Sequence, residues 1–193
     1  MTPLQVGVLV SGRGSNLRAL QQASSTAAYR VALVVSNVAD AGALAFAADV
    51  GVPTAVLPHR AYPTRAAFES AVTEALRAAG VELVVLAGFM RVLTPVFVGA
   101  WAGRIVNIHP SLLPAFPGLD APGQALRAGA TVSGCTVHLV DEGTDTGPIL
   151  AQAEVPILPG DTEDTLAARI LVEEHRLLPR VVDALARQRR AAA

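Results

Sequence analysis

Short apolar runs and helix-like segments alternate along the first half of the chain. Residues 4–10 are apolar and rich in valine, and they stop at a glycine-containing turn at 11–16, which is typical of a buried strand. A helix-like pattern follows from Leu17, with Ser15 or Asn16 as its expected N-cap. Further strands are predicted at 31–35, 54–57 and 83–87, and further helices at 41–50 and 64–79. This alternation predicts an α/β fold, a Rossmann-like open and mostly parallel sheet with helices on both faces.

The second half of the chain is less regular. Residues 104–109 predict a strand that carries polar groups to its carboxyl end, and 131–140 and 149–155 are further β-type runs. The segment between residues 110 and 122 contains four prolines, of which Pro122 is the last. Because proline fixes its own backbone and donates no hydrogen bond, this segment is predicted to form neither helix nor central strand.

A long final helix is predicted from about residue 161. Its apolar residues between Leu166 and Leu185 fit one helical stripe, and Pro179 is expected to kink it. The basic end at 187–190 is expected to fray in solvent. No change of composition marks a second domain, so residues 1–193 are expected to form a single one.

Composition narrows the class of protein. Hydrophobic residues make up 52% of the 193 positions, which excludes disorder, and a single cysteine, Cys135, excludes a disulfide framework. The net charge of −1 provides no field that would attract nucleic acid or anionic lipid. The sequence has no apolar run of membrane-spanning length and no secretory signal, and its four histidines are too scattered for a metal site. We therefore expect a cytoplasmic protein without a metal, a membrane anchor or a nucleic-acid partner.

The first candidate site is the glycine loop, where Gly12 and Gly14 let the backbone approach a ligand closely. At the carboxyl edge of a parallel sheet the N-terminus of the next helix attracts anions, and Ser15 and Asn16 add a hydroxyl and an amide. The loop has Leu17 where a dinucleotide fingerprint has its third glycine, and it lacks the lysine of a P-loop. It therefore fits a single phosphate group, although a plain tight turn explains the same residues.

The second candidate site is the pair Asn107 and His109, which lie two apart in a predicted strand and therefore point to the same face. An amide beside an imidazole can stabilise an oxyanion that develops at an acyl carbon. Asp145, in the acidic connector 141–147, would favour the imidazolium and orient the ring if the fold brings it near. The plainer interpretations are a histidine bonded to the strand-end backbone and a solvated turn aspartate. His138, in an apolar strand, is interpreted as a satisfied core histidine.

Three longer strings of residues carry a resemblance to a known family. They are Ala87-Gly88-Phe89-Met90-Arg91, Asn107-Ile108-His109-Pro110-Ser111-Leu112-Leu113-Pro114 and Asp145-Thr146-Gly147-Pro148-Ile149. With them, the chain resembles the folate-dependent formyltransferases from about residue 5 to about residue 180. Residues 11–17, Ser36-Asn37 and Asp40 are similar to the branch of that family that formylates glycinamide ribonucleotide in purine synthesis.

The resemblance implies transfer of the formyl group of 10-formyltetrahydrofolate to the amine of glycinamide ribonucleotide. The folate is then a co-substrate consumed in each turnover, and neither a tightly bound cofactor nor a metal is implied. The implied catalytic residues are Asn107, His109 and Asp145. The implied ribonucleotide contacts are Gly14, Ser15, Asn16 and Glu174. The implied folate contacts are Arg65, Met90, Arg91, Val92, Leu93, Asn107, Val140 and Asp141.

Other functions share some of these features. A formyltetrahydrofolate deformylase passes the formyl group to water and carries an N-terminal regulatory domain, for which a strand that starts at Leu4 leaves no room. A methionyl-tRNA formyltransferase needs a C-terminal nucleic-acid module and a basic surface, which the length and net charge disfavour. A non-catalytic folate- or nucleotide-binding module is expected to lack part of the catalytic trio. Residues 1–100 are expected to form a phosphate-binding half and residues 101–193 a folate-binding and catalytic half, in a monomer or homodimer.

One segment departs from the family pattern. Residues 119–126 read Leu-Asp-Ala-Pro-Gly-Gln-Ala-Leu, whereas members of the family often carry a histidine or another basic residue in this loop. The resemblance therefore leaves the geometry of this loop open, while the catalytic trio is unaffected.

Overall fold

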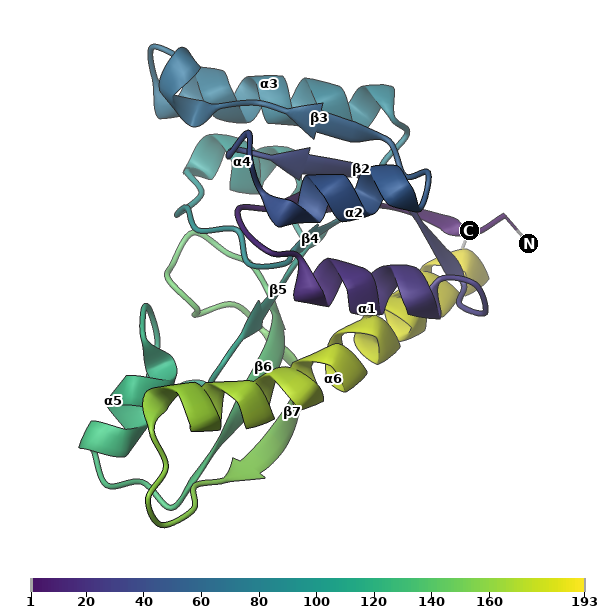
Figure 1. Ribbon diagram of the computed structural model, residues 1–193. Helices are drawn as coiled ribbons and strands as arrows, with labels where there is room; N and C mark the ends of the chain where they lie inside the picture. The colour runs from purple at the N-terminus through teal and green to yellow at the C-terminus, as the bar shows by residue number, and fades with distance from the viewer. Residues whose placement is uncertain (1, 193) are drawn as a thin grey trace.

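Seven strands pair into one sheet within residues 2–192, the part of the chain that the computed structural model describes (Figure 1). The strands are β1 (Leu4–Val10), β2 (Tyr29–Ser36), β3 (Thr54–Val56), β4 (Leu83–Leu86), β5 (Ile105–His109), β6 (Val132–Leu139) and β7 (Ile149–Pro156). Their order is β3-β2-β1-β4-β5-β6-β7. The first five pair in parallel, whereas β6 is antiparallel to both β5 and β7. The predicted open, mostly parallel sheet is therefore confirmed.

Helices cover both faces of the sheet, as predicted (Figure 1). They are α1 (Ser15–Ala23), α2 (Gly42–Asp49), the 3-10 helix η1 (His59–Ala61), α3 (Arg65–Ala78), α4 (Pro95–Ala100), α5 (Ala121–Arg127) and α6 (Glu163–Ala191). In β1 the side chains of Val8 and Val10 belong to the core beneath α1, α2 and α6, whereas Leu9 belongs to the core beneath α3 and α4. Because alternate side chains of a strand point to opposite faces, a strand buried on both faces is apolar at nearly every position.

The prediction of a helix-free segment up to Pro122 is wrong, because Pro122 lies in the first turn of α5. The amide of a residue in the first turn has no acceptor within the helix, so a proline is tolerated there. Asp120 caps this helix by accepting from the backbone N–H of Gly123 at 3.3 Å, and its carboxylate pairs with Arg127 at 2.7 Å. The segment that departs from the family pattern thus forms a short, capped helix.

The prediction of a frayed basic end on the last helix is also wrong. Helix α6 continues through Arg187–Arg190, and Arg190 pairs at 2.6 Å with Glu82, the residue before β4. Arg189 donates to the carbonyl of Gly103 at 2.7 Å.

Pro179 does not end the helix, since α6 runs uninterrupted from Glu163 to Ala191 with Pro179 buried within it. Burial of the apolar stripe of α6 outweighs the loss of one helical hydrogen bond.

The packing of β6 against β7 generates a stability prediction at Gly134. A Cβ at this position would overlap the carbonyl oxygen of Ala153 and lie 2.8 Å from Leu112 Cδ2. Because a strand backbone cannot yield as a side chain does, we expect Gly134→Ala to lower the free energy of unfolding by about 1–3 kcal/mol. Urea denaturation followed by circular dichroism measures the change.

The matched control is Gly99→Ala in α4, where a Cβ would meet no described atom within 4 Å. Alanine is the better helix former, so this variant should gain up to about 1 kcal/mol. Equal stability of the two variants would contradict the proposed close approach of the two strands at Gly134.

Candidate functional site

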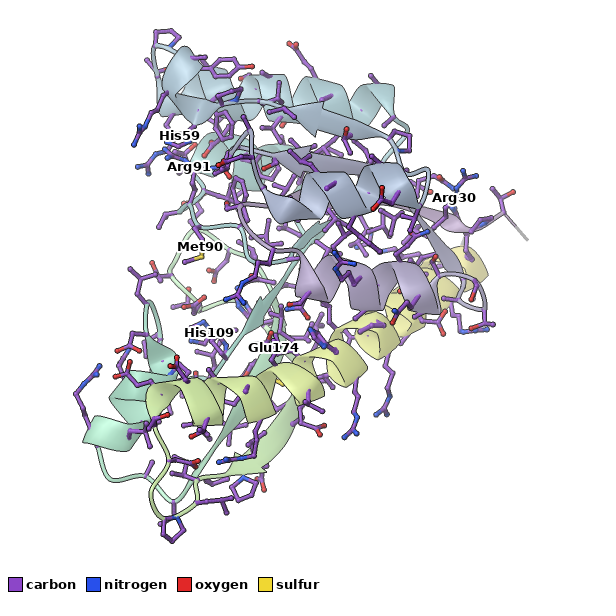
Figure 2. The ribbon with its side chains drawn as sticks, in the orientation of Figure 1. Arg30, His59, Met90, Arg91, His109 and Glu174 are labelled. Atoms are coloured by element: carbon purple, nitrogen blue, oxygen red, sulfur yellow. The ribbon has the colours of Figure 1, made fainter. Side chains whose placement is uncertain are left out.

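A cavity of about 520 Å³ opens at the carboxyl end of the sheet and gathers most of the predicted site residues. Parallel strands present their carboxyl ends at the same edge, so segments far apart in the sequence meet there. His109 reaches the cavity from β5 and Glu174 reaches it from α6 (Figure 2). The predicted residues that line it are Asn16, Met90, Arg91, Val92, Leu93, Asn107, His109, Val140, Asp141, Asp145 and Glu174.

Asp145 lies between two imidazoles. Its Oδ2 atom is 3.4 Å from Nδ1 of His109, and its Oδ1 atom is 3.7 Å from Nε2 of His138. The backbone N–H of Gly118 donates to the same carboxylate at 2.8 Å. The interaction with His138, the Gly118 amide and the charge of His109 together lower the pKa of Asp145 below its ordinary 3.8, against the opposing effect of burial. The carboxylate is therefore held ionised beside His109.

The hydrogen bonds of the two histidines fix where their protons lie. Nε2 of His109 is 2.9 Å from the carbonyl oxygen of Phe116, so Nε2 must donate and Nδ1 is directed toward Asp145. Nδ1 of His138 donates in the same way to the carbonyl of Leu139 at 2.9 Å. This leaves Nε2 of His138 facing the amide of Asn107 at 3.2 Å. Neutral His138 accepts from Asn107 there, and protonated His138 presents an N–H to Asp145.

His138 is the site residue that the sequence interpretation missed. It is buried with both ring nitrogens bonded, as interpreted, but it also lines the cavity, because β5 and β6 pair in a register that sets Asn107 directly opposite it. Side chains opposite each other in an antiparallel pair are close enough to bond. The one signal in the sequence was a polar residue inside an apolar strand, and that signal does not reveal which strand lies beside it.

The loop before α5 forms hydrogen bonds with both His109 and Asp145. Phe116 accepts from His109 and Gly118 donates to Asp145, so this loop contacts both members. Phe116 and Asp145 have φ angles of 54° and 56°, in the left-handed region that residues other than glycine rarely adopt. Such backbone conformations persist only where the surrounding contacts hold them, and they cluster at functional sites.

The glycine loop gives α1 an open N-terminus. The expected cap by Ser15 or Asn16 is wrong, because the cap position is Gly14, which has a φ of 78°. A Cβ at Gly14 would lie 2.6 Å from the Cβ of Ala43, so α2 packs too closely for any larger residue. Among the described residues no side chain caps α1, and its first-turn amides stay available to an anion.

Asn16 connects the glycine loop to the last helix. Its Nδ2 atom donates to Oε2 of Glu174 at 2.8 Å, across 158 residues of sequence. Both side chains are 7% exposed, and burial raises the pKa of Glu174 above its ordinary value. Two residues assigned separately to the ribonucleotide in the sequence are therefore a bonded pair on one wall of the cavity.

Three predicted residues lie outside the described lining of this cavity. Gly14 is buried against Ala43 of α2, and Ser15 opens instead onto a neighbouring groove between α1 and α6 that Arg18 and His175 also line. Arg65 is exposed at the first residue of α3. The structure thus brings together the catalytic trio, the pair Asn16 and Glu174 and the segment 90–93, but not Arg65.

Residues 2–192 contain neither a metal site nor a membrane-spanning helix. Within that range, no group of three or more histidine, cysteine, aspartate or glutamate side chains is arranged to hold a metal ion. In the same described range, the helices include none that is both long and apolar enough to cross a membrane.

The family and the curated relatives that the chain matches agree with one another. The model of the family described as formyl transferase matches residues 4–182. The chain is 52% identical over 186 residues to the trifunctional purine biosynthetic protein adenosine-3 of Drosophila pseudoobscura pseudoobscura, an alignment that covers 94% of this chain and 14% of that protein. It therefore spans about one seventh of that relative. It is 48% identical to the phosphoribosylglycinamide formyltransferase of Mycobacterium tuberculosis, covering 95% of this chain and 86% of the relative.

Solved structures agree with these relatives. The crystal structure of glycinamide ribonucleotide transformylase 1 from Symbiobacterium toebii matches with a TM-score of 0.94 and 49% identity, covering 97% of this chain and 89% of that one. The corresponding enzyme from Geobacillus kaustophilus matches with a TM-score of 0.92 and 45% identity, covering 95% and 99%. The fold expected from the family resemblance is therefore confirmed.

The setting of Asp145 generates a prediction of acid sensitivity. The folded state lowers the pKa of this carboxyl below 3.8, so its contribution to stability is fully present above pH 3.8 and is lost as the pH falls through the lowered value. We expect Asp145→Asn to be less stable than the parent above pH 3.8 and the two to converge in stronger acid. Urea unfolding between pH 2.5 and 7 measures this, and a difference independent of pH would contradict it.

Proposed function

Because the chain belongs to the formyl transferase family, we propose that it transfers the formyl group of 10-formyltetrahydrofolate to the amine of glycinamide ribonucleotide, a step of purine synthesis. The Mycobacterium tuberculosis relative, which aligns over most of its own length, carries this activity in its name. The other activities of the trifunctional relatives are not part of the proposal, because this chain spans only a small part of them.

One observation carries the proposal: Asn107, His109 and Asp145 share a cavity with both proposed substrate walls. On one wall, Asn16 and Glu174 lie beside the open N-terminus of α1, where a phosphate and a sugar can be held. On another, Met90, Val92 and Leu93 supply apolar surface. A transfer reaction requires two ligands side by side at the reacting groups, and this cavity offers both.

The chemistry then follows from the groups present. The neutral amine of the ribonucleotide attacks the formyl carbon, forms the new C–N bond and turns the carbonyl oxygen into an oxyanion. Asn107 donates a hydrogen bond to this oxyanion, worth about 3–4 kcal/mol when well placed. Protonated His109, whose two N–H groups face Phe116 and Asp145, stabilises the oxyanion through its positive charge. The bond from the formyl carbon to the folate nitrogen then breaks, and that nitrogen takes up the proton that the amine loses.

Asp145 is assigned two parts in this step. As a carboxylate of lowered pKa it orients His109 and stabilises the imidazolium, since Oδ2 lies 3.4 Å from Nδ1. It also receives the amine proton briefly on the way to the departing nitrogen. His138 acts through its neighbours, because its ring sets the amide of Asn107 at 3.2 Å and lies beside Asp145.

The folate is assigned to the wall formed by residues 90–93, 140 and 141. Met90 and Val92 are 69% and 63% exposed, and the flat rings of a bound folate would remove that apolar surface from water. Arg65 and Arg91 are cations suited to the carboxylates of the folate tail, and Arg91 is placed by its contact with the Phe68 ring at 5.9 Å. The folate is consumed as a co-substrate.

The ribonucleotide is assigned to the glycine loop and α6. The backbone amides after Gly14, together with the Ser15 hydroxyl on the neighbouring groove, are assigned to the single phosphate, and Glu174 is assigned to sugar hydroxyls. Under these assignments neither half of the chain binds one substrate alone. The folate segment 90–93 lies in residues 1–100, and Glu174, assigned to the ribonucleotide, lies in residues 101–193.

The deciding measurement is release of tetrahydrofolate from 10-formyltetrahydrofolate with and without glycinamide ribonucleotide. We expect release to require the ribonucleotide and to match its formylation one to one. Release at the same rate without the ribonucleotide would identify water as the acceptor and favour a deformylase.

His109→Ala and Asp145→Ala should each lower kcat by about 10²–10³-fold while folate binding persists. The charge control Glu154→Gln, on the exposed part of β7, should keep the parental rate.

The phosphate assignment has its own test. We expect Ser15→Ala to raise the KM for the ribonucleotide by about 3–10-fold and to leave the KM for folate unchanged, because one hydrogen bond to a charged group is lost. Ser25→Ala, an exposed serine beyond the other end of α1, is the matched control. Steady-state kinetics with each substrate varied in turn measures both constants. A larger effect on the folate KM would move the phosphate site elsewhere.

A further inference from the structure

A row of hydrogen bonds crosses the carboxyl ends of four neighbouring strands. Met90 follows β4, and its backbone N–H donates to Oγ of Ser11, which follows β1, at 3.0 Å. The Ser11 hydroxyl lies 2.6 Å from Oδ1 of Asn37, which follows β2. Nδ2 of Asn37 lies 3.2 Å from Nδ1 of His59, which follows β3. The row runs in the order in which these strands lie in the sheet, β3-β2-β1-β4.

The donors and acceptors in this row have a fixed direction. The Met90 amide can only donate, so Ser11 Oγ accepts from it and gives its own hydrogen to Asn37 Oδ1. That bond turns the NH₂ group of Asn37 toward the imidazole, so Nδ1 of His59 must accept. The row is therefore complete with His59 neutral and its proton on Nε2. Each group in it orients the next one.

Few side chains hold the segment that receives the end of this row: Phe89 packs against the core, and Arg91 lies over the Phe68 ring. Residues 88–92 form no helix or strand, and Met90 and Val92 are largely exposed. Ser11 forms two hydrogen bonds with the segment. Its hydroxyl accepts from the Met90 amide, and its backbone N–H donates to the carbonyl of Gly88 at 3.2 Å. A loop without helix or strand hydrogen bonds depends on such backbone bonds for much of its shape.

The same imidazole also contacts the ring beneath Arg91. His59 lies edge-on to Phe68 at 6.4 Å between ring centroids, and the Arg91 guanidinium lies 5.9 Å from the same ring. His59, Arg91 and Met90 follow one another along the same side of the molecule in Figure 2. His59 therefore reaches two successive residues of the segment, one through the row of hydrogen bonds and one through Phe68.

We propose that His59, Asn37 and Ser11 are positioning residues that hold residues 88–92 in the shape that receives the folate. This inference rests on the proposed function. Within the described lining of the cavity none of the three appears, so they act through the Met90 backbone rather than by contact with either substrate. Their effect should therefore fall on folate binding and leave the ribonucleotide site and the chemical step unchanged.

The direct test observes the Met90 amide in the ligand-free protein by nitrogen-15 NMR. We expect His59→Leu and Ser11→Ala to make exchange of this amide proton with solvent about 2- to 10-fold faster, the factor given by losing one hydrogen bond. His59→Asn should restore the parental rate, because Oδ1 of asparagine can stand where Nδ1 of histidine stood. The parent should also show the Nε2–H form of His59. Unchanged exchange at Met90 in both loss variants would overturn the proposal.

The kinetic test separates positioning from packing. His59→Leu should raise the KM for 10-formyltetrahydrofolate by about 2- to 10-fold, with kcat and the ribonucleotide KM within about 2-fold of the parent. The control is Tyr62→Leu, which alters packing against Phe68 at 5.7 Å and leaves the row intact. An equal folate effect in the control would overturn the role of the row. A parent without ribonucleotide-dependent transfer would instead refute the proposed function, and Met90 exchange would still decide whether the row holds the loop.

Discussion

The carboxylate of Asp145 joins four separate parts of the molecule. It lies between the imidazoles of His109 on β5 and His138 on β6, accepts the amide of Gly118 in the loop before α5, and sits on the connector between β6 and β7. An ionised carboxylate buried to this extent is tolerated only when it is paired and hydrogen-bonded. The left-handed backbone at Asp145 and at Phe116 is the local cost of bringing these parts together.

The rest of the site is arranged around the edge at which the strands end. A parallel sheet places its carboxyl ends and the following helix N-termini on one side, so groups suited to an anion and groups suited to an acyl oxygen lie at the same edge. Asn16 and Glu174 bond across the boundary between α1 and α6, and the row from His59 to Met90 bonds across the other end of the same edge. The sheet supplies the alignment, and side-chain hydrogen bonds supply the finer positions.

The sequence predicted the sheet well because its signals are local. A valine-rich run such as Leu4–Val10 followed by glycines is a strand whatever it packs against, and the alternation of runs with helical stripes indicates a parallel sheet. The errors arose where tertiary contacts override local preference. Pro122 entered a helix because its place in the first turn costs no hydrogen bond, and Arg190 became ordered because Glu82 lies beside it. His138 is buried, as interpreted, but its place in the site was missed because nothing local indicates that it lies opposite Asn107.

The sequence by itself determined the α/β class, the glycine turn before α1 and the co-direction of Asn107 with His109, since each depends only on backbone geometry over a few residues. Its longer strings also carried the family resemblance. Only the tertiary structure decided that Asp145 lies beside His109, that Glu174 bonds Asn16 across 158 residues, and that Arg65 stays outside the cavity. The physical reason is range: periodicity and turn chemistry act between neighbours in the chain, whereas a site at the carboxyl edge of a sheet is assembled from strand order and register, which depend on the packing of the whole core.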